Sequence, residues 1–362
     1  MSVVFMKEDL IQGIYHDAIM IQKNFENNDF ENMEKGCEEL CKKYDDLNAE
    51  DYFIKLPKNK NLPFFAYGIF KPGQLSYSKI EKYVSNSPKE YDIPHEMRYR
   101  DGIPFIIKNE NDEGYKTKGF LIKFKNENDS INAYREICKS EPDKLYYWRE
   151  KPICVNGELA NVLVGKKPSH GSYIDRSDGP IGNYDGKKDP FFEDAIEIIE
   201  EDLYKDWNPN NLKDFFILQM KYALLWASIE RYCNFRYDYK SINQMLIDFA
   251  TKEKVFAESL QGNISPNEEI LRKQINRKLT NDEEKLKFIP IPKNRKVYSS
   301  KNLDNAKLNP KNPKKSINYY YTIRCNVVHR GKSRDDEKEM LFPSLVELLN
   351  IFKAVLKESF KN

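Results

Sequence analysis

The chain has 362 residues, with 59 basic and 57 acidic side chains, a net charge of +2, 32% charged residues and 13% aromatic residues. This composition excludes a disordered chain and is typical of a globular protein, and no apolar run approaches the roughly 20 residues of a membrane span. The balanced charge also excludes a general attraction to nucleic acid, so any binding of RNA requires local basic segments.

Six cysteines are scattered along the chain without a pairing pattern, and the start MSVVFMKEDL lacks the basic and long apolar regions of a signal peptide. Both features favour a reducing cytoplasm. Cys37 and Cys41 lie one helical turn apart, but none of the four histidines is close to them in the sequence. We therefore expect no metal site and no cofactor.

A chain of this length is expected to form two domains and a small appendage. The appendage is predicted over residues 1–58. Apolar residues recur at helical spacing from Leu10 to Ile21 and again from Met33 to Leu47, on either side of the polar run ENNDFEN. The pattern predicts a helical hairpin that packs on the next domain or on a partner subunit.

Short apolar runs broken by Gly and Pro begin near Leu62 and read FFAYGIF, IPFII, KGFLIKF, PICV and LANVLVG. They predict the strands of an antiparallel or mixed sheet or barrel over residues 59–165. The run KKPSHGSYIDRSDGPIGNYDGK follows at residues 166–187, without periodicity, and predicts a linker.

Helical spacing returns over residues 188–362, so the expected fold class is α+β with an all-α C-terminal domain. The last predicted helix carries an apolar stripe from Leu341 to Leu356, which suits a bundle core or a dimer seam. A basic segment from Lys293 to Lys315 precedes the end of this domain and offers phosphate contacts to RNA, or is an ordinary solvated loop.

The segment Tyr67-Gly68-Ile69-Phe70-Lys71-Pro72-Gly73 predicts a loop with free backbone amides after a buried strand. Together with the runs at Ile103–Ile106 and Lys118–Phe124 and with Tyr147-Trp148-Arg149, it resembles the gamma-glutamylcyclotransferase-like family, whose superfamily includes the plant AIG-two-like proteins. The resemblance covers about residues 62–165. The family's acidic residue corresponds to Glu141, although this chain lacks the preceding LD and has Pro142 in place of glycine.

This resemblance implies that Glu141 transfers a proton while a gamma-glutamyl amine cyclises to 5-oxoproline. It also implies that Tyr67, Gly68, Ile69, Phe70 and Tyr147 bind the small gamma-glutamyl-type ligand. The alternative is a domain kept for ligand binding or scaffolding, in which Glu141 is only a carboxylate at the end of a helix.

Arg324 and His329 lie five residues apart, near the end of a Tyr-rich predicted helix. An arginine binds phosphate and a histidine transfers protons near neutral pH, which are the two functions that metal-free RNA cleavage needs. With the trailing HRG, residues 188–362 resemble the HEPN family, whose active members carry Arg, four to six residues and His. The resemblance implies an endoribonuclease in which His329 acts on the ribose 2′-hydroxyl and Arg324 holds the scissile phosphate. Asn326 would orient either the phosphate or the imidazole of His329.

Five residues of an ideal helix advance about 500°, so Arg324 and His329 point roughly 140° apart. Two copies about a twofold axis bring both pairs into one cleft, and we therefore expect a homodimer through the helical domain. Glu230, Arg231 and Arg330 are further candidates for the RNA cleft, with a solvated helix face as the alternative for the first two.

The sequence thus predicts a cytoplasmic ribonuclease that acts as a toxin or anti-phage defence effector on single-stranded or tRNA-like RNA, with an antitoxin or trigger protein as a possible partner. The cyclotransferase-like domain would serve ligand sensing, regulation or assembly. Two alternatives stay open. One is a gamma-glutamylamine cyclotransferase with a non-catalytic helical dimerisation domain, and the other is a non-catalytic protein that binds RNA or a partner.

Overall fold

The computed structural model describes most of the chain from residue 54 onward. The described ranges are 54–100, 102–107, 114–141, 145–166, 181–203, 211–237, 241–263, 296–297, 306–330 and 335–360, with six single positions before residue 54. The helical hairpin predicted within residues 8–47 lies outside these ranges, as do most of the predicted linker and much of the basic segment before residue 306.

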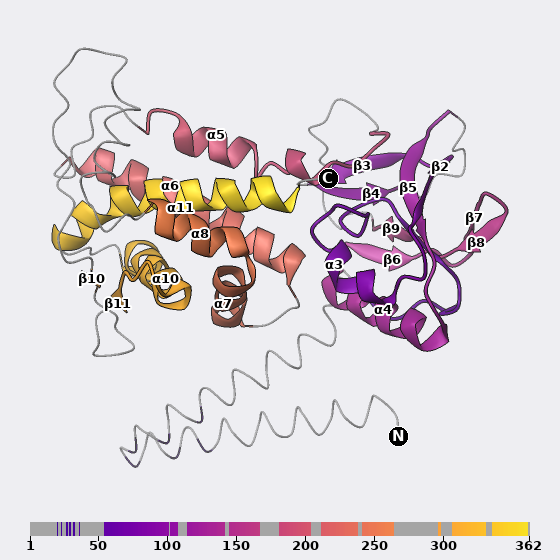
Figure 1. Ribbon diagram of the computed structural model, residues 1–362, viewed down its shortest axis with the longest axis horizontal. Helices are drawn as coiled ribbons and strands as arrows, with labels where there is room; N and C mark the ends of the chain where they lie inside the picture. The colour runs from indigo at the N-terminus through magenta and orange to yellow at the C-terminus, as the bar shows by residue number, and fades with distance from the viewer. Residues whose placement is uncertain are drawn as a thin grey trace.

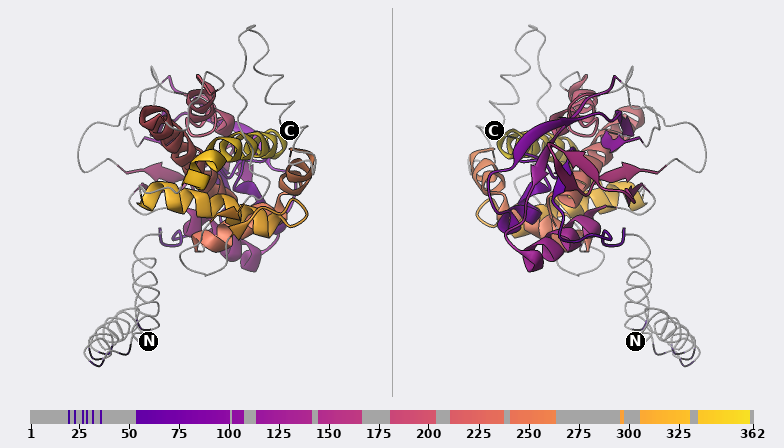
Figure 2. Two further views of the ribbon diagram at one scale, coloured as in Figure 1. Left: turned by 90° about the vertical axis from the view of Figure 1, so that its left-hand side faces the viewer. Right: turned by 90° about the vertical axis from the view of Figure 1, so that its right-hand side faces the viewer.

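Two regions lie side by side in Figure 1: a β-rich half, residues 54–166, and a helical half, residues 189–360. Figure 2 views them from either end, with the helices in front in one view and the strands in front in the other. Each half has its own cluster of buried apolar side chains. The molecule is therefore mixed α+β, as the sequence predicts, whereas the exact domain boundaries stay a prediction.

The β-rich half is built on a three-stranded antiparallel sheet in the order β1-β5-β2. Its strands and helices are β1 (Phe64–Ala66), α3 (Tyr77–Ile80), the 3-10 turn η1 (Glu81–Tyr83), β2 (Lys89–Ile93), β3 (Met97–Arg100), β4 (Ile103–Ile106), β5 (Thr117–Ile122), α4 (Glu127–Ser140), β6 (Tyr146–Trp148), β7 (Ile153–Val155), β8 (Glu158–Ala160) and β9 (Leu163–Gly165). The pairs β3-β4, β6-β9 and β7-β8 are also antiparallel. The described strands form small sheets and no closed barrel, so the barrel alternative is wrong and the sheet alternative is confirmed.

Helix α4 lies along one side of this half in Figure 1, and Glu141 is its C-cap residue. Its start is fixed by Asn126, whose side chain accepts a hydrogen bond from the Asp129 amide at 2.9 Å, a contact that satisfies one of the unpaired amides of the first turn. Tyr134, which is fully buried, donates to the Leu62 carbonyl at 2.7 Å and makes an edge-to-face contact with Trp148. These contacts hold the end of α4 beside strand β6.

The helical half packs its helices around one large apolar core. Its elements are η2 (Gly186–Lys188), at its edge, α5 (Asp194–Glu200), α6 (Leu212–Arg236), α7 (Ile242–Lys252), α8 (Lys254–Asn263), β10 (Lys296–Val297), β11 (Ala306–Lys307), α10 (Pro313–Arg330) and α11 (Asp335–Ser359). Leu345, Leu348 and Phe352 of α11 are fully buried within the chain. The stripe from Leu341 to Leu356 therefore forms the bundle core, which is one of its two predicted roles.

Contacts between the halves involve the second half of α6 and the segment around α3. Ser76 Oγ donates to the Phe235 carbonyl at 2.5 Å, and Lys79 Nζ donates to the Asn234 carbonyl at 3.3 Å. Lys79 Nζ also donates to Ser140 Oγ at 3.0 Å, one residue before Glu141. The end of α6 is thus tied to the end of α4. Among the described helices, none has the length and apolarity of a membrane span.

Candidate functional site

A small pocket in the β-rich half brings together most of the residues predicted for the cyclotransferase-like site. The cavity has a volume of about 20 Å³. It is lined by Phe64, Tyr67, Gly68, Ile69, Phe70, Pro104, Glu141, Tyr146 and Leu163. Side chains that are far apart in the sequence therefore meet here, and Glu141 faces the loop at Tyr67-Gly68 as the resemblance implies.

Buried strand β1 leads directly into this loop and fixes its position. The Tyr67 hydroxyl donates to the Leu163 carbonyl at 3.0 Å and accepts from the Ile106 amide at 3.3 Å. A Cβ added to Gly68 would lie 3.0 Å from Pro104 Cγ, which leaves little room for a side chain. The tyrosine thus anchors the loop, and the glycine lets its backbone pass close to β4.

The backbone carbonyls of this loop accept hydrogen bonds from residues that follow them closely in the sequence. The carbonyls of Gly68 and Ile69 accept from the amides of Lys71 and Ser76, at 3.0 and 3.1 Å. Within the described residues, the amides of Gly68, Ile69 and Phe70 donate to no backbone carbonyl. These three amides are the groups that a bound carboxylate would use.

Glu141 is the C-cap residue of α4 and its side chain is 6% exposed. Burial raises the pKa of its carboxyl group to about 8, and the nearby charge of Lys79 acts in the opposite direction. Burial likewise raises the pKa of Tyr67 and Tyr146 above the usual tyrosine range. At neutral pH the pocket therefore holds a mostly protonated carboxylic acid between two neutral phenols.

Tyr147 does not line this pocket, whereas its neighbour Tyr146 does. Successive side chains of a strand point to opposite faces, so only one of the two can reach Glu141. The Tyr146 hydroxyl donates to the Pro104 carbonyl at 2.6 Å. Sequence reasoning missed Tyr146, Pro104 and Leu163, because nothing in the sequence says which face of β6 turns inward or which strand lies opposite.

The second candidate site lies on helix α10, which carries Arg324, Asn326, His329 and Arg330. An oxygen of Glu230, on α6, lies 3.5 Å from a terminal nitrogen of Arg324, and the guanidinium also lies over the Tyr321 ring. The side chains of Arg324 and Glu230 are 20% and 25% exposed. Of the two predicted cleft residues on α6, Glu230 thus contacts the arginine.

Helix α10 is held in place by its tyrosines. Tyr222 of α6 donates to the Tyr320 carbonyl at 2.9 Å, and Tyr320 donates to Glu347 of α11 at 3.0 Å. Both tyrosines are fully buried. The Tyr-rich stretch before Arg324 is therefore the part of the helix that packs in the core, and it sets the direction in which Arg324 points.

Asn326 does not share the partly exposed surface of Arg324. It is 5% exposed, and two residues of a helix advance about 200°, so its side chain points to the opposite side of α10. The side chains of His329 and Arg330 lie outside the described part of the structure, although both residues belong to α10. Their distance from Arg324 stays a prediction.

Arg231 points away from the predicted RNA cleft. Its Nε lies 2.7 Å from an oxygen of Asp189, whose side chain is fully buried, and its guanidinium lies over the rings of Phe191 and Phe235. Adjacent residues on a helix point about 100° apart, which explains why Glu230 and Arg231 have different surroundings. The sequence predicts that Arg231 faces either the RNA cleft or solvent. In the structure it instead forms an ion pair with Asp189.

Comparisons with models of protein families, with curated proteins and with solved structures find no match for this chain. Both family resemblances therefore stay predictions that depend on the residues quoted above. In the described part of the chain, no group of three or more His, Cys, Asp or Glu side chains is arranged to hold a metal ion.

Proposed function

We propose that this protein is a metal-independent endoribonuclease of the HEPN type, with its site at Arg324 and His329. The observation that carries the proposal is the pairing of Arg324 with Glu230, because it holds a partly exposed guanidinium at the surface of the helix that also carries His329. A guanidinium in this position can receive a phosphate oxygen in place of the carboxylate.

In the proposed reaction, His329 takes the proton of a ribose 2′-hydroxyl, and the 2′-oxygen forms a bond to the adjacent phosphorus. The bond from phosphorus to the 5′-oxygen breaks, and that oxygen receives a proton from a second imidazole. The products are a 2′,3′-cyclic phosphate and a 5′-hydroxyl. Arg324 stabilises the charge that develops on the phosphate oxygens.

The second imidazole belongs to a second copy of the chain, since Arg324 and His329 point about 140° apart on one helix. An exposed apolar stripe on α6 supports association of two copies. Leu212, Phe216 and Met220 recur every four residues and are 65%, 50% and 64% exposed. Phe216→Glu should give a monomer with little cleavage activity, measured by light scattering and by RNA cleavage.

Single-stranded or tRNA-like RNA is the proposed substrate. The described lysines before and at the start of α10 support it, because Lys307, Lys311, Lys314 and Lys315 are all exposed. These lysines precede Arg324 by nine or more residues, about 14 Å along the helix for the nearest, so they would contact neighbouring phosphates of a bound strand, and such contacts weaken with salt. The physiological role that we propose is that of a toxin or antiviral defence effector, controlled by an antitoxin or trigger protein.

The experiment compares the wild type with Arg324→Ala and His329→Ala on total RNA, in buffer with EDTA. Loss of a general acid or base lowers such rates roughly 10²- to 10⁴-fold, and loss of a group that stabilises charge in the transition state roughly 10²- to 10³-fold, so both variants should be nearly inactive. Asn318→Ala is the matched control, because Asn318 is an exposed residue of the same helix. Cleavage that persists in both variants, or products without cyclic phosphate ends, would show that the assignment is wrong.

Cells supply a second readout of the same proposal. Expression of the wild type should arrest growth and degrade RNA, whereas Arg324→Ala at equal abundance should do neither. Growth arrest by both proteins would contradict the proposed role as a toxin, even if cleavage in solution were confirmed.

A second candidate function, gamma-glutamylamine cyclotransferase, is favoured by the pocket around Glu141. There the predicted acid and the loop amides meet, and the pKa of about 8 suits a group that accepts and returns a proton near neutral pH. The cavity of about 20 Å³ has room for one water molecule, so a substrate requires that the pocket open.

Release of 5-oxoproline from a panel of gamma-glutamyl amines tests this second candidate. Activity in the wild type that is lost in Glu141→Gln and kept in Glu127→Gln, an exposed residue at the other end of α4, supports it. No release from any substrate leaves the domain with the proposed role in ligand sensing, regulation or assembly.

A further inference from the structure

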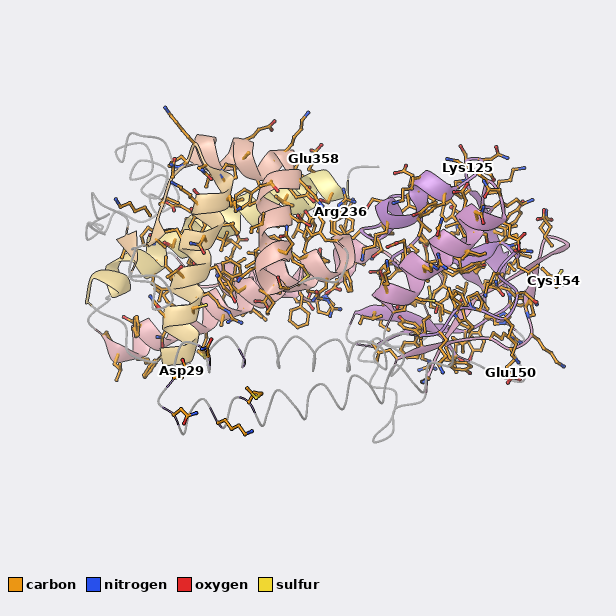
Figure 3. The ribbon with its side chains drawn as sticks, turned by 90° about the horizontal axis from the view of Figure 1, so that it is seen from below. Asp29, Lys125, Glu150, Cys154, Arg236 and Glu358 are labelled. Carbon is orange, nitrogen blue, oxygen red and sulfur yellow. The ribbon has the colours of Figure 1, made fainter. Side chains whose placement is uncertain are left out.

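A groove of about 500 Å³ opens on the β-rich half next to the Glu141 pocket and is much larger than that pocket. One wall is the irregular segment from Ile54 to Asn59, and the other is β6 with the turn that follows it, Arg149 and Glu150. Tyr146 borders both cavities. Glu150 lies on the side of the β-rich half away from the helices, so this groove is a site separate from Arg324 (Figure 3).

The irregular wall is held in place by hydrogen bonds from the folded domain. The Lys55 carbonyl accepts from Trp148 Nε1 at 2.8 Å, and the Asn59 carbonyl accepts from Asn161 Nδ2 at 2.7 Å. The Ile54 amide donates to the Glu141 carbonyl at 3.2 Å. A segment without regular structure is therefore fixed at both ends, and the groove is formed before any ligand arrives.

The charges that line the groove are mostly positive. Lys55, Lys58, Arg149 and Lys166 line it together with one carboxylate, Glu150, and the Arg149 guanidinium also contacts His95 outside the groove. This is an unusual concentration in a chain whose net charge is only +2. Lys55 and Lys58 are exposed, and within the described residues neither has an ion pair. Such a groove attracts an anionic ligand.

Aromatic side chains line the same groove. Tyr147 and Trp148 are both half-buried. Trp148 is fixed by edge-to-face contacts with Phe64 and Tyr134, whereas Tyr147 makes no ring contact with another described residue. A nucleotide has a base that stacks on an aromatic ring and a phosphate that pairs with a lysine or an arginine. A groove with both aromatic rings and cations therefore matches both parts of a nucleotide.

We propose that this groove binds a nucleotide, either free or as one unit of an RNA strand, with the base on Tyr147 and the phosphate on Lys55 and Lys58. The volume of about 500 Å³ is in the range of small-molecule sites and is sufficient for a nucleotide. The proposal does not depend on the ribonuclease activity, and it gives the β-rich half a ligand different from a gamma-glutamyl compound.

The test is direct binding to the full-length protein. Calorimetry with AMP and UMP measures the free nucleotide, and fluorescence anisotropy with a labelled ten-residue 2′-O-methyl RNA measures a strand that cannot be cleaved by its own 2′-hydroxyl. Tyr147→Leu, and Lys55→Glu combined with Lys58→Glu, should each weaken binding at least about tenfold. Lys89→Glu, an exposed lysine of β2 outside the groove, should leave binding unchanged.

Two controls give each outcome one meaning. Thermal unfolding checks that the variants fold, and repeating the titrations with Arg324→Ala separates this site from the proposed cleavage site. Equal affinity for the free nucleotide and for the strand would identify the ligand of the groove as a free nucleotide. Tighter, salt-sensitive binding of the strand would identify it as RNA. Absence of binding by both probes, binding unaffected by the groove substitutions, or equal binding of pyrophosphate alone would overturn the proposal.

Discussion

The Glu141 pocket and the Arg324 surface represent two ways of presenting an ionisable side chain. Glu141 is buried in a cavity whose walls come from strands and loops far apart in the sequence. Arg324 is partly exposed on one helix and contacts the Glu230 carboxylate of a neighbouring helix. The first arrangement changes the chemistry of the carboxyl group through desolvation, whereas the second leaves a charge accessible to a ligand.

This difference shows that burial alone does not identify a site residue in this molecule. The question is whether a buried ionisable group has a partner of opposite charge close to it. Glu141 and Asp189 are both buried acids whose pKa burial raises, but Asp189 forms an ion pair with Arg231 at 2.7 Å, whereas Glu141 forms none with a described residue. A buried acid with a close cation is a structural contact. Four predictions test that distinction, beginning with the largest expected effect.

Arg231→Ala should destabilise the protein by about 3–5 kcal/mol, because it leaves the buried Asp189 carboxylate without its cation. Burial already raises the pKa of Asp189, and Arg231 acts in the opposite direction. Chemical denaturation measures the free energy of unfolding. The double variant Asp189→Asn with Arg231→Met should recover part of the loss, since no unpaired charge is then buried. A loss below about 1 kcal/mol in Arg231→Ala would show that the pair is not structural.

The second prediction concerns pH and Glu141. Its pKa is about 8 in the folded protein and near 4.5 when the chain is unfolded, so between these values only the folded state holds the proton. The free energy of unfolding therefore falls as pH rises from about 4.5 to about 8, by at most about 1.4 kcal/mol per pH unit from this group. Over the whole window the loss amounts to a few kcal/mol.

Urea denaturation at pH 5 and at pH 8 tests this slope. Glu141→Gln should remove it, so that the variant gains stability relative to the wild type as pH rises. Glu127→Gln, which changes an exposed acid at the start of the same helix, should keep the wild-type slope. Equal slopes in the wild type and in Glu141→Gln would mean that the carboxyl group is not desolvated.

The third prediction applies one change, tyrosine to phenylalanine, in both halves. The Tyr67 hydroxyl satisfies two buried backbone groups, the Leu163 carbonyl and the Ile106 amide, so Tyr67→Phe should cost about 1–3 kcal/mol. The Tyr222 hydroxyl donates to the Tyr320 carbonyl, which lies inside a helix where a backbone amide is the usual donor. Tyr222→Phe should therefore cost only about 1 kcal/mol. Equal losses in unfolding experiments would contradict the contrast.

Side-chain periodicity is a local property, and it predicted the mixed α+β class and, within the described residues, a region of short strands followed by a helical one. Helical spacing also identified the stripe from Leu341 to Leu356, although only packing decided between core and dimer seam. The barrel alternative failed because β1 pairs with β5 on one edge and meets only a single bridge, at Asn161, on the other. Closure depends on contacts between distant segments, which no local pattern encodes.

The same limit applies to the sites. The motif Tyr67-Gly68-Ile69-Phe70 and the acid Glu141 line one pocket as predicted, since one continuous loop faces the end of one helix. Which tyrosine of β6 joins them depends on strand orientation, and the sequence reasoning chose Tyr147 in place of Tyr146. On α6, spacing could not distinguish Glu230 from Arg231, because their surroundings come from α10 and from the segment around Asp189.

The smallest effect on stability is expected for Glu230→Gln, which keeps the shape of the side chain and removes its charge. The ion pair with Arg324 is 3.5 Å long and the two side chains are partly exposed, but the Glu230 oxygen that faces Arg324 is itself buried without a hydrogen bond. The loss of the ion pair and the relief of this buried charge oppose each other, so stability should change by less than about 1 kcal/mol. The Glu230 carboxylate then no longer competes for the guanidinium, and RNA should bind a few-fold more tightly in anisotropy measurements. Arg324→Ala should show the opposite change in binding at similar stability. A large loss of stability in Glu230→Gln with unchanged RNA binding would instead place this pair with Arg231 and Asp189, as a contact that holds the helices together.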